Sequence, residues 1–230
     1  MNIHGFTKTT LLDFPGHVAC TVFTAGCNFR CPFCHNGDLV LQPEIYPVIE
    51  ESVIISHIKK RRNILTGICI SGGEPTLQPD LPDFMKKIKE TGLLVKLDTN
   101  GYRPDILKNL IDKGLVDYIA MDIKSSCENY SSVTDITIDI SRILESVNII
   151  SSSNIDYEFR TACVKGLHTD NDFISIAKWL PSDCTYFLQS YKENEAVINK
   201  SCSSFSKNEL ENFKEIIQPF IPSVSLRGVD

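Results

Sequence analysis

Residues 24–37 read TAGCNFRCPFCHNG and hold three cysteines, Cys27, Cys31 and Cys34, in the spacing C-x3-C-x2-C. Three thiols in so short a loop can converge on one small inorganic centre. A [4Fe–4S] cluster normally takes four cysteine ligands, so three leave one iron open to an exchangeable ligand. A structural zinc site would need a fourth ligand, and His35 is awkwardly placed to supply it. The loop therefore favours an iron–sulfur cluster with one open position.

Short β-branched runs recur along the chain at spacings that leave room for a helix between them. The expected strands are 18–23, 67–70, 93–97, 118–123, 157–164, 186–189 and 224–226. Segments 106–111 and 210–220 carry apolar residues at i, i+3 and i+4, which is typical of a helix with one buried face. This alternation predicts an α/β fold whose parallel sheet is open or curled into a partial barrel, with its chemistry at the carboxyl ends of the strands.

Composition narrows the class of protein. The chain has 230 residues, 42% of them hydrophobic, and a formal net charge of −6, so we expect one domain over 1–230 and no nucleic-acid partner. It has no signal-peptide pattern and no apolar stretch of membrane-spanning length, which predicts a cytoplasmic protein that binds no membrane. Nine cysteines in such a chain are therefore expected to be reduced thiols.

A second motif, ISGGEP, occupies residues 70–75 at the end of the expected strand 67–70. Gly72 and Gly73 allow the backbone to approach a ligand closely, and Glu74 can accept a hydrogen bond from an ammonium group. Alone, the motif is equally compatible with a tight connection from a strand to a helix.

Together, the cysteine loop and the GGEP turn resemble the radical S-adenosylmethionine (radical SAM) superfamily. The closer resemblance is to activating enzymes of glycyl radical enzymes, and among them to activating proteins of anaerobic ribonucleoside-triphosphate reductases. The segments that carry it are 5–6, 11–16, 27–36, 98–101, 121–124, 157–161, 166–168 and 227–229. Lys165 departs from the proline expected before Gly166, which affects only a loop. The resemblance implies a partial (β/α)6 barrel with helices outside.

The resemblance also implies a reaction and its cofactors. Cys27, Cys31 and Cys34 would hold one [4Fe–4S] cluster, whose open iron binds the amino and carboxylate groups of SAM. One electron would then cleave SAM to methionine and a 5′-deoxyadenosyl radical. We expect a single cluster, because the sequence carries no second cysteine array like those of enzymes with auxiliary clusters.

Further residues are implied to bind the cofactors or the substrate. Asn36, Asp122 and Lys124 are similar to residues that line the SAM pocket, and Gly72, Gly73 and Glu74 would hold the methionine amino group of SAM. Arg160 and Gln189 are expected at the mouth of this pocket from the period of their strands. Asp98 and Thr99, with Asp122, resemble a monovalent-cation site. Asp13 resembles the position that meets the glycine loop of a substrate protein.

Three of these residues have simpler interpretations. An aspartate at a strand end, such as Asp98, commonly caps a helix. Arg160 could form a surface ion pair. Asp13 could form a turn before Pro15 and Gly16. Cys20, Cys69 and Cys163 fall in apolar runs, where we expect cysteine to pack as a small hydrophobic residue.

The motifs are compatible with three functions. The first is a radical SAM oxidoreductase that makes a glycyl radical on a partner, the anaerobic ribonucleotide reductase, with a flavodoxin- or ferredoxin-type electron donor. The second keeps the chemistry but acts on a small molecule, as 7-carboxy-7-deazaguanine synthase-like enzymes do. The third is a non-catalytic module that binds zinc or an iron–sulfur cluster. The likeness over 98–101 and 121–124 favours the first.

Overall fold

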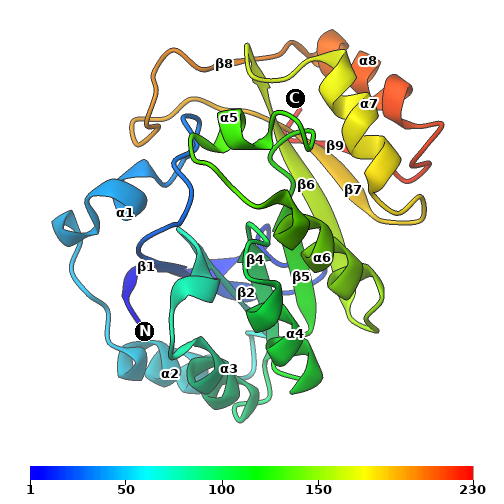
Figure 1. Cartoon of the computed structure of the whole chain (residues 1–230). Coiled ribbons are helices and arrows are strands. Elements are labelled where there is room, and N and C mark those ends of the chain that lie inside the picture. The colour runs from blue at the N-terminus through cyan, green and yellow to red at the C-terminus, as the bar shows by residue number, and fades with distance from the viewer. Residues whose placement is uncertain (230) are drawn as a thin grey trace.

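A computed structural model describes residues 1–229 and contains one curved sheet whose strands follow the chain order (Figure 1). The strands are β1 (Ile3–Thr10), β2 (Ala19–Thr24), β3 (Gly67–Gly72), β4 (Leu94–Thr99), β5 (Tyr118–Asp122), β6 (Asp156–Lys165), β7 (Tyr186–Ser190), β8 (Ser203–Ser204) and β9 (Ser225–Arg227). From β2 to β7 and on to β9 every pairing along the sheet is parallel, and β1 and β9 form its two edges. The sheet is therefore an incomplete barrel, as predicted.

Helices fill most of the connections between the parallel strands. They are α1 (Gly37–Leu41), α2 (Glu51–Lys60), α3 (Leu81–Lys89), α4 (Pro104–Asp112), α5 (Tyr130–Thr134), α6 (Ile140–Ser151), α7 (Asp170–Trp179) and α8 (Lys207–Ile217), with short 3-10 turns at Pro43–Ile45 and Pro75–Leu77. Figure 1 shows α2, α3, α4 and α6 following one another along the outside of the sheet, with α7 and α8 beside β7.

Two strands and one helix end differ from the sequence prediction. Strand β1 is antiparallel to β2 and was not predicted, because its sequence IHGFTKTT lacks a continuous apolar run. The two-residue strand β8 pairs with the end of β6 and is too short to leave a sequence signal. Helix α8 ends at Ile217, so Phe220 lies beyond the helix and is exposed.

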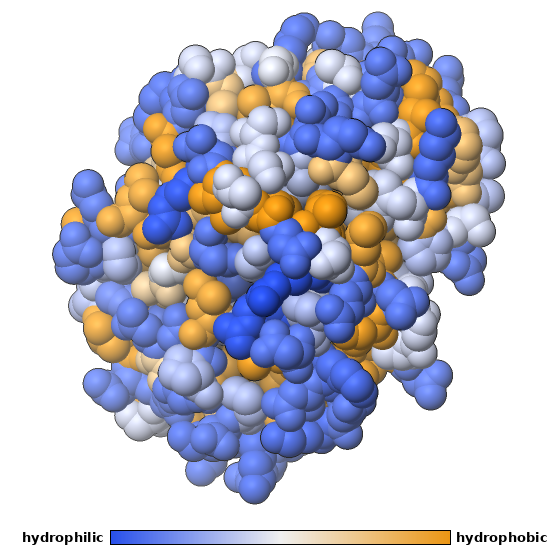
Figure 2. Space-filling view, in the orientation of Figure 1, coloured by the Kyte–Doolittle hydropathy of each residue, from blue (hydrophilic) through white to orange (hydrophobic). Residues whose placement is uncertain are grey.

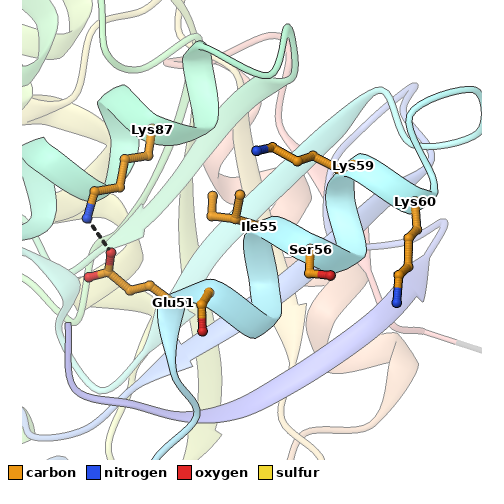
Figure 3. Close-up of a pocket in the computed structure, with 7 residues that line it drawn as sticks. Glu51, Ile55, Ser56, Lys59, Lys60 and Lys87 are labelled. Carbon is orange, nitrogen blue, oxygen red and sulfur yellow. Dashed lines mark hydrogen bonds and ion pairs between the residues drawn. The ribbon is translucent and has the colours of Figure 1, made fainter.

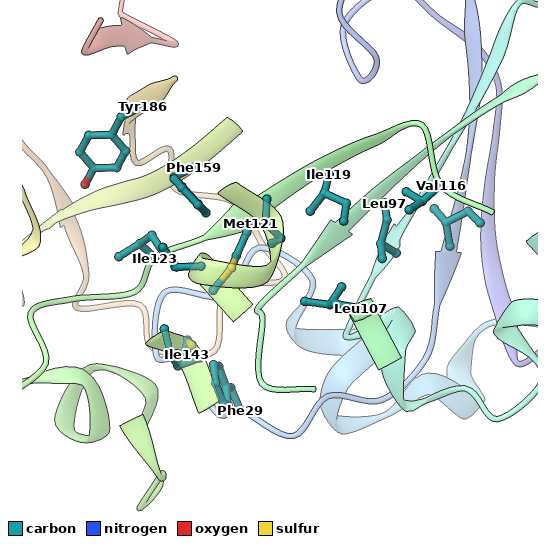
Figure 4. Close-up of a cluster of buried hydrophobic side chains, with 14 of the residues drawn as sticks. Phe29, Leu97, Leu107, Val116, Ile119, Met121, Ile123, Ile143, Phe159 and Tyr186 are labelled. Carbon is teal, nitrogen blue, oxygen red and sulfur yellow. The ribbon is translucent and has the colours of Figure 1, made fainter. Parts of the chain in front are cut away.

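The two faces of the sheet differ in chemistry because successive side chains of a strand point to opposite sides. Leu97, Ile119 and Met121 are fully buried in the apolar layer between the sheet and the helices. Figure 4 shows them facing Leu107 of α4 and Ile143 of α6. The alternate residues of the same strands include Lys96, Asp98 and Asp122 and lie on the concave side, where the candidate site is found.

The surface shows no broad apolar area on the face seen in Figure 2, where apolar patches are separated by hydrophilic ones. Within residues 1–229, no helix has both the length and the apolar character needed to cross a membrane.

Candidate active site

The cysteine loop follows β2 directly and lines a pocket that also holds buried polar groups. Cys27, Cys31 and Cys34 all contribute to this pocket, whose volume is about 830 Å³. The loop is held by backbone hydrogen bonds near its start and in its middle, since the Gly26 N–H donates to the Leu39 carbonyl at 2.9 Å and the Arg30 N–H donates to the Thr134 carbonyl at 2.9 Å. The three thiols are thus fixed on one wall of the pocket.

Burial controls the protonation of these thiols. Desolvation raises the pKa of Cys27 to about 12 and, against the opposing charge of Lys124, the pKa of Cys31 to about 11. Burial also raises the pKa of Cys34, against a backbone hydrogen bond and the charge of Lys124. Without a metal the thiols are therefore protonated at neutral pH.

The donor set fits an iron–sulfur cluster. The Phe29 N–H donates to Cys27 Sγ at 3.3 Å, and the Asn100 side chain approaches the same sulfur at 3.8 Å. Beside them, Asn28 Nδ2 is buried and, within the described residues, has no hydrogen-bond partner. Amide donors around a sulfur suit the negative charge that a cluster places there. No three His, Cys, Asp or Glu side chains of residues 1–229 are arranged to hold a single metal ion.

The GGEP turn packs against the cysteine loop, and this contact explains its glycines. The Gly73 N–H donates to the Thr24 carbonyl and the Glu74 N–H to the Gly26 carbonyl, each at 2.8 Å. A Cβ at Gly73 would lie 1.9 Å from the Gly26 oxygen, and Gly72 has a φ of +119°. The glycines therefore let two backbones meet, in addition to lining the pocket.

The side chain of Glu74 was expected in the pocket, but it lies in the buried interior beside it. Its carboxylate is fully buried and accepts hydrogen bonds from the Asn100 N–H at 2.7 Å and from Thr99 Oγ1 at 2.8 Å, as well as from the N–H and hydroxyl of Thr76. It does not line the pocket. Protein donors already hold the carboxylate, so a direct contact from this side chain to a ligand ammonium stays a prediction that these contacts do not support.

The other predicted residues come together in the pocket. Those that line it are Asp13, Asn36, Gly72, Gly73, Asp98, Asp122, Lys124, Arg160 and Gln189, with Thr99 beside them. Asn36 is fixed by donating from Nδ2 to the Gly72 carbonyl at 2.8 Å, so it joins the two loops. The structure thus gathers at one site residues that lie up to 176 positions apart, from Asp13 to Gln189.

An alternating row of charges crosses the pocket wall from β4 to β6. Arg160 Nε donates to Asp122 Oδ1 at 2.8 Å and Arg160 Nη1 lies 3.6 Å from Asp98 Oδ1, while Lys124 Nζ donates to Asp122 Oδ2 at 3.0 Å. Burial alone would raise the pKa of both carboxyl groups, but Arg160, aided by Lys124 at Asp122, outweighs it and holds them below their usual range. Both aspartates are therefore ionised.

The sequence also allowed simpler roles for three pocket residues: a helix cap at Asp98, a surface ion pair at Arg160 and a turn at Asp13. The structure shows neither of the first two. Asp98 caps no helix, since α4 begins after Arg103. Arg160 forms ion pairs, but with a side chain only 12% exposed it is not a surface residue. Asp13 accepts a hydrogen bond from Thr21 Oγ1 at 2.5 Å, so it anchors its loop while also lining the pocket.

Several charged residues in or behind the pocket wall were not predicted, although the sequence held a signal for them. Lys96, Glu158 and Arg227 all lie in the charged interior, and Arg227 binds Glu158 through two hydrogen bonds of 2.6 and 2.9 Å. Polar residues at alternate positions of an otherwise apolar strand, such as Lys96 and Asp98, point to the same side. That period of two would have found them.

The remaining cysteines of the apolar strands divide into two kinds. Cys20 and Cys163 are fully buried in the apolar core, as predicted. Cys69 is equally buried, but its sulfur lies 3.7 Å from Lys96 Nζ, so it borders the polar interior. Its neighbours, and not its burial, differ from the expectation.

A second hollow lies between α2 and α3 (Figure 3). It is lined by Glu51, Ser52, Ile55, Ser56, Lys59, Lys60 and Lys87. Glu51 forms ion pairs with the exposed Lys87 at 2.7 Å and with the N-terminal ammonium group at 2.8 Å, and no charged side chain of the lining is fully buried. It is not a candidate active site.

Comparisons with known proteins agree with this geometry. The family model described as "Radical SAM superfamily" matches residues 21–180. A protein of Methanocaldococcus jannaschii, named as a glycyl-radical enzyme activating enzyme, is 30% identical and is matched over 99% of this chain and 96% of its own. The pyruvate formate-lyase 1-activating enzyme of Escherichia coli K12 is 27% identical over 74% of this chain and 70% of the enzyme.

Solved structures share the fold. SuiB of Streptococcus suis bound to S-adenosylmethionine has a TM-score of 0.66 at 14% identity, over 88% of this chain and 48% of SuiB. Coproporphyrinogen III oxidase of Escherichia coli has a TM-score of 0.62 at 13% identity, over 91% of this chain and 54% of the oxidase. The chain spans about half the length of these two structures, and at such identities the likeness concerns the fold alone.

Proposed function

Because the chain belongs to the radical SAM superfamily and, within it, to the glycyl-radical enzyme activating enzymes, we propose that it generates a glycyl radical on an anaerobic ribonucleotide reductase. The family implies a [4Fe–4S] cluster and SAM as cofactors. The observation that carries the proposal is a single pocket that connects the three cysteines to an exposed apolar loop at the opposite end of β2.

The cysteine loop would hold the cluster through Cys27, Cys31 and Cys34. When bound, the reduced cluster and SAM supply a 5′-deoxyadenosyl radical, which removes a hydrogen atom from a glycine Cα. The buried residues Phe29, Cys31 and Phe33 would limit the access of water to this end of the pocket, and the amide groups of Phe29 and Asn100 face Cys27 Sγ.

The opposite walls would orient SAM. The backbone of Gly72 and Gly73 and the side chain of Asn36 line the pocket beside the cysteines, where the methionine part would lie. Lys124 and Arg160 offer cationic donors to its carboxylate, and Gln189 completes this side. The role of Glu74 in this scheme is indirect, because it shapes the turn that carries Asn100.

The far end of the pocket suits a macromolecule. The cysteine loop follows the last residue of β2, and the loop 11–17 precedes the first residue of the same strand. The two loops therefore lie at opposite ends of a strand about 17–20 Å long. Leu12 and Asp13 of that loop line the same pocket. Leu11 and Leu12 are 72% and 90% exposed. Single exposed leucines occur on most protein surfaces and need no explanation. Two adjacent ones at the entrance of a pocket form an apolar patch, which is typical of a surface that contacts another protein.

The choice of the reductase rests on the end-to-end resemblance of the sequence. A flavodoxin- or ferredoxin-type protein is the proposed electron donor.

The test mixes this protein, the anaerobic ribonucleotide reductase of the same organism, SAM and a reductant without oxygen. We expect a glycyl doublet in the EPR spectrum and one 5′-deoxyadenosine for each radical. The triple variant Cys27→Ala, Cys31→Ala, Cys34→Ala is the control and should give neither signal.

Two results would replace the proposal. Cleavage of SAM without a protein radical, together with consumption of a small deazapurine precursor, would assign a small-molecule substrate. Absence of SAM cleavage with a fully loaded cluster would refute the enzymatic function.

A further inference from the structure

A fully buried lysine lies beneath the charged wall of the pocket. Lys96, on β4, is 2% exposed and its ammonium group forms an ion pair with Asp98 Oδ1. Its strand neighbours are Cys69 on β3 and Tyr118 on β5, which border the same ammonium. Lys96 does not line the pocket itself, so any effect on a ligand passes through Asp98.

The aspartate oxygens around this lysine are all engaged by protein donors. Asp98 Oδ1 is shared by Lys96 and Arg160, and Asp98 Oδ2 accepts from Ser71 Oγ at 3.1 Å. Asp122 Oδ1 accepts from Arg160 and Asp122 Oδ2 from Lys124. A hard cation needs several free oxygen ligands, and here each carboxylate oxygen already has a cation or a hydroxyl group.

Thr99, the remaining member of the expected cation site, is also engaged. Its hydroxyl donates to Glu74 Oε1 at 2.8 Å and accepts from the Gly101 N–H at 3.1 Å. The described residues therefore do not fit the monovalent-cation site that the resemblance implies for Asp98, Thr99 and Asp122.

The charge balance indicates what the wall binds instead. Lys96, Arg160 and Lys124 bring three positive charges against the two of Asp98 and Asp122. Glu158 lies 3.9 Å from Arg160 but is already paired with Arg227. On this wall the cations thus exceed the aspartates by one, and Asp13, the other nearby carboxylate of the pocket, is held by Thr21. Lys124 and Arg160 line the pocket and offer cationic donors to an anionic ligand group such as a carboxylate.

We propose that Lys96 is a built-in cation that takes the place of a bound monovalent metal ion: it neutralises Asp98, so that the Arg160 and Lys124 side of the wall can hold the carboxylate of SAM. Lys96 is thus a positioning residue, and SAM binding is independent of Na⁺ and K⁺. The inference rests on SAM being the ligand, as proposed above, but not on the identity of the partner enzyme.

The first experiment uses the anaerobically purified holoprotein without any partner. SAM is titrated against the EPR signal of the reduced cluster in Na⁺, K⁺ or tetramethylammonium chloride at equal ionic strength. We expect SAM dissociation constants that agree within about twofold. A loss of about tenfold or more in tetramethylammonium would overturn the inference.

The second experiment removes the buried ammonium. We expect Lys96→Met to weaken SAM binding by about tenfold or more in tetramethylammonium, because Asp98 then keeps an uncompensated charge that draws Arg160 away from the carboxylate of SAM. Potassium or ammonium ions should restore part of the affinity. Lys108→Met, which removes an exposed lysine paired with Asp112, is the matched control and should bind SAM as the wild type does.

The outcomes separate this inference from the proposed function. Unchanged SAM affinity of Lys96→Met in all three salts would refute it, and if that variant lost its cluster the wild-type salt comparison would still decide. Salt-independent SAM binding without radical transfer to the reductase would refute only the proposed partner. No perturbation of the cluster by SAM in any salt would overturn both.

Discussion

At the scale of single residues, the cysteines of the loop 24–37 are largely shielded from water, although iron binds a cysteine only as the charged thiolate. Iron binds the thiolate, whereas burial of Cys27 and Cys31 raises each pKa and favours the thiol. Each ligand must therefore release a proton when the cluster enters. Loading of the apoprotein is coupled to pH through these residues.

This coupling predicts stronger loading at higher pH. Because the loaded state binds fewer protons than the apoprotein, raising the pH from 7.0 to 8.5 should increase the iron retained against a fixed chelator. Iron and sulfide analysis measures it. Cys127→Ala, outside the loop, should behave as the wild type, and the triple variant of the loop cysteines should retain no cluster at either pH. Iron retention that is flat or falls with pH would contradict the assignment.

Glu74 gives a second prediction at this scale. The two carboxylate oxygens of Glu74 accept hydrogen bonds from Thr99 Oγ1 and from the Asn100 N–H. In Glu74→Gln an NH2 group replaces one of these oxygens and faces a donor, so we expect the free energy of unfolding to fall by about 2 kcal/mol. Urea unfolding measures it, with the exposed Glu90→Gln as control. A variant of normal stability but weak SAM affinity would instead indicate a direct ligand contact.

At the scale of elements, the site depends on the contact between two loops at neighbouring strand ends. The cysteine loop after β2 and the GGEP turn after β3 share backbone hydrogen bonds, because β2 and β3 are parallel and end at the same edge of the sheet. The absence of a side chain at Gly73 is what permits this approach.

We therefore expect Gly73→Ala to separate the loops and to lose the cluster. Gly114→Ala is the control: Gly114 has a φ of +62° but open space around its Cβ, so this change should cost about 1–2 kcal/mol through backbone strain alone. Iron content and thermal unfolding compare the two variants. Full iron content in Gly73→Ala would show that the loops can separate without harm to the site.

At the scale of the whole molecule, ion pairs join strands that are distant in sequence across the open barrel. Arg160 of β6 bridges Asp98 of β4 and Asp122 of β5, and Glu158 of β6 reaches Arg227 of β9. The concave side is thus held by charges, where a closed barrel would use apolar layers. The same charges leave the pocket polar and accessible.

The network predicts how stability depends on acid. Asp98 and Asp122 have a pKa below the usual 3.8, so the stability that their ionisation contributes is present above about pH 4 and is lost as the pH falls through their folded values. Arg160→Met should cost about 3 kcal/mol at pH 7, since it leaves two buried carboxylates with less charge compensation. The deficit should shrink toward pH 4, as the aspartates of the variant take up protons. Urea unfolding from pH 4 to 7 measures it, and an equal deficit at all pH values would contradict the network.

The loop 11–17 supplies a prediction about the partner. Leu12→Glu should weaken productive binding of the reductase by about tenfold, because it places a charge in an apolar contact, and should leave SAM binding unchanged. Radical yield against reductase concentration measures it, with Val53→Glu on the exposed side of α2 as control. Equal radical yields in both variants would place the partner elsewhere.

The sequence by itself determined the strand and helix order, the cysteine loop and the family. Local patterns suffice for these features: strand runs such as 67–70 are continuous and apolar, and the three cysteines lie in one loop. Most of the expected pocket residues also line the pocket, because parallel strands bring their carboxyl ends to one edge. Strand β1 escaped because its pairing with β2 depends on tertiary contacts and not on its own apolar content.

Only the tertiary structure determined which charged side chains pair with one another. Glu74 is held by the turn at Asn100, Arg160 is shared by two aspartates, and Lys96 lies against Asp98. Each residue carries a charge that a sequence shows, but the partner of that charge is set by strand register and by the low polarity of the buried interior. In such surroundings every charge must find a partner close by, and only the assembled sheet determines which one it finds.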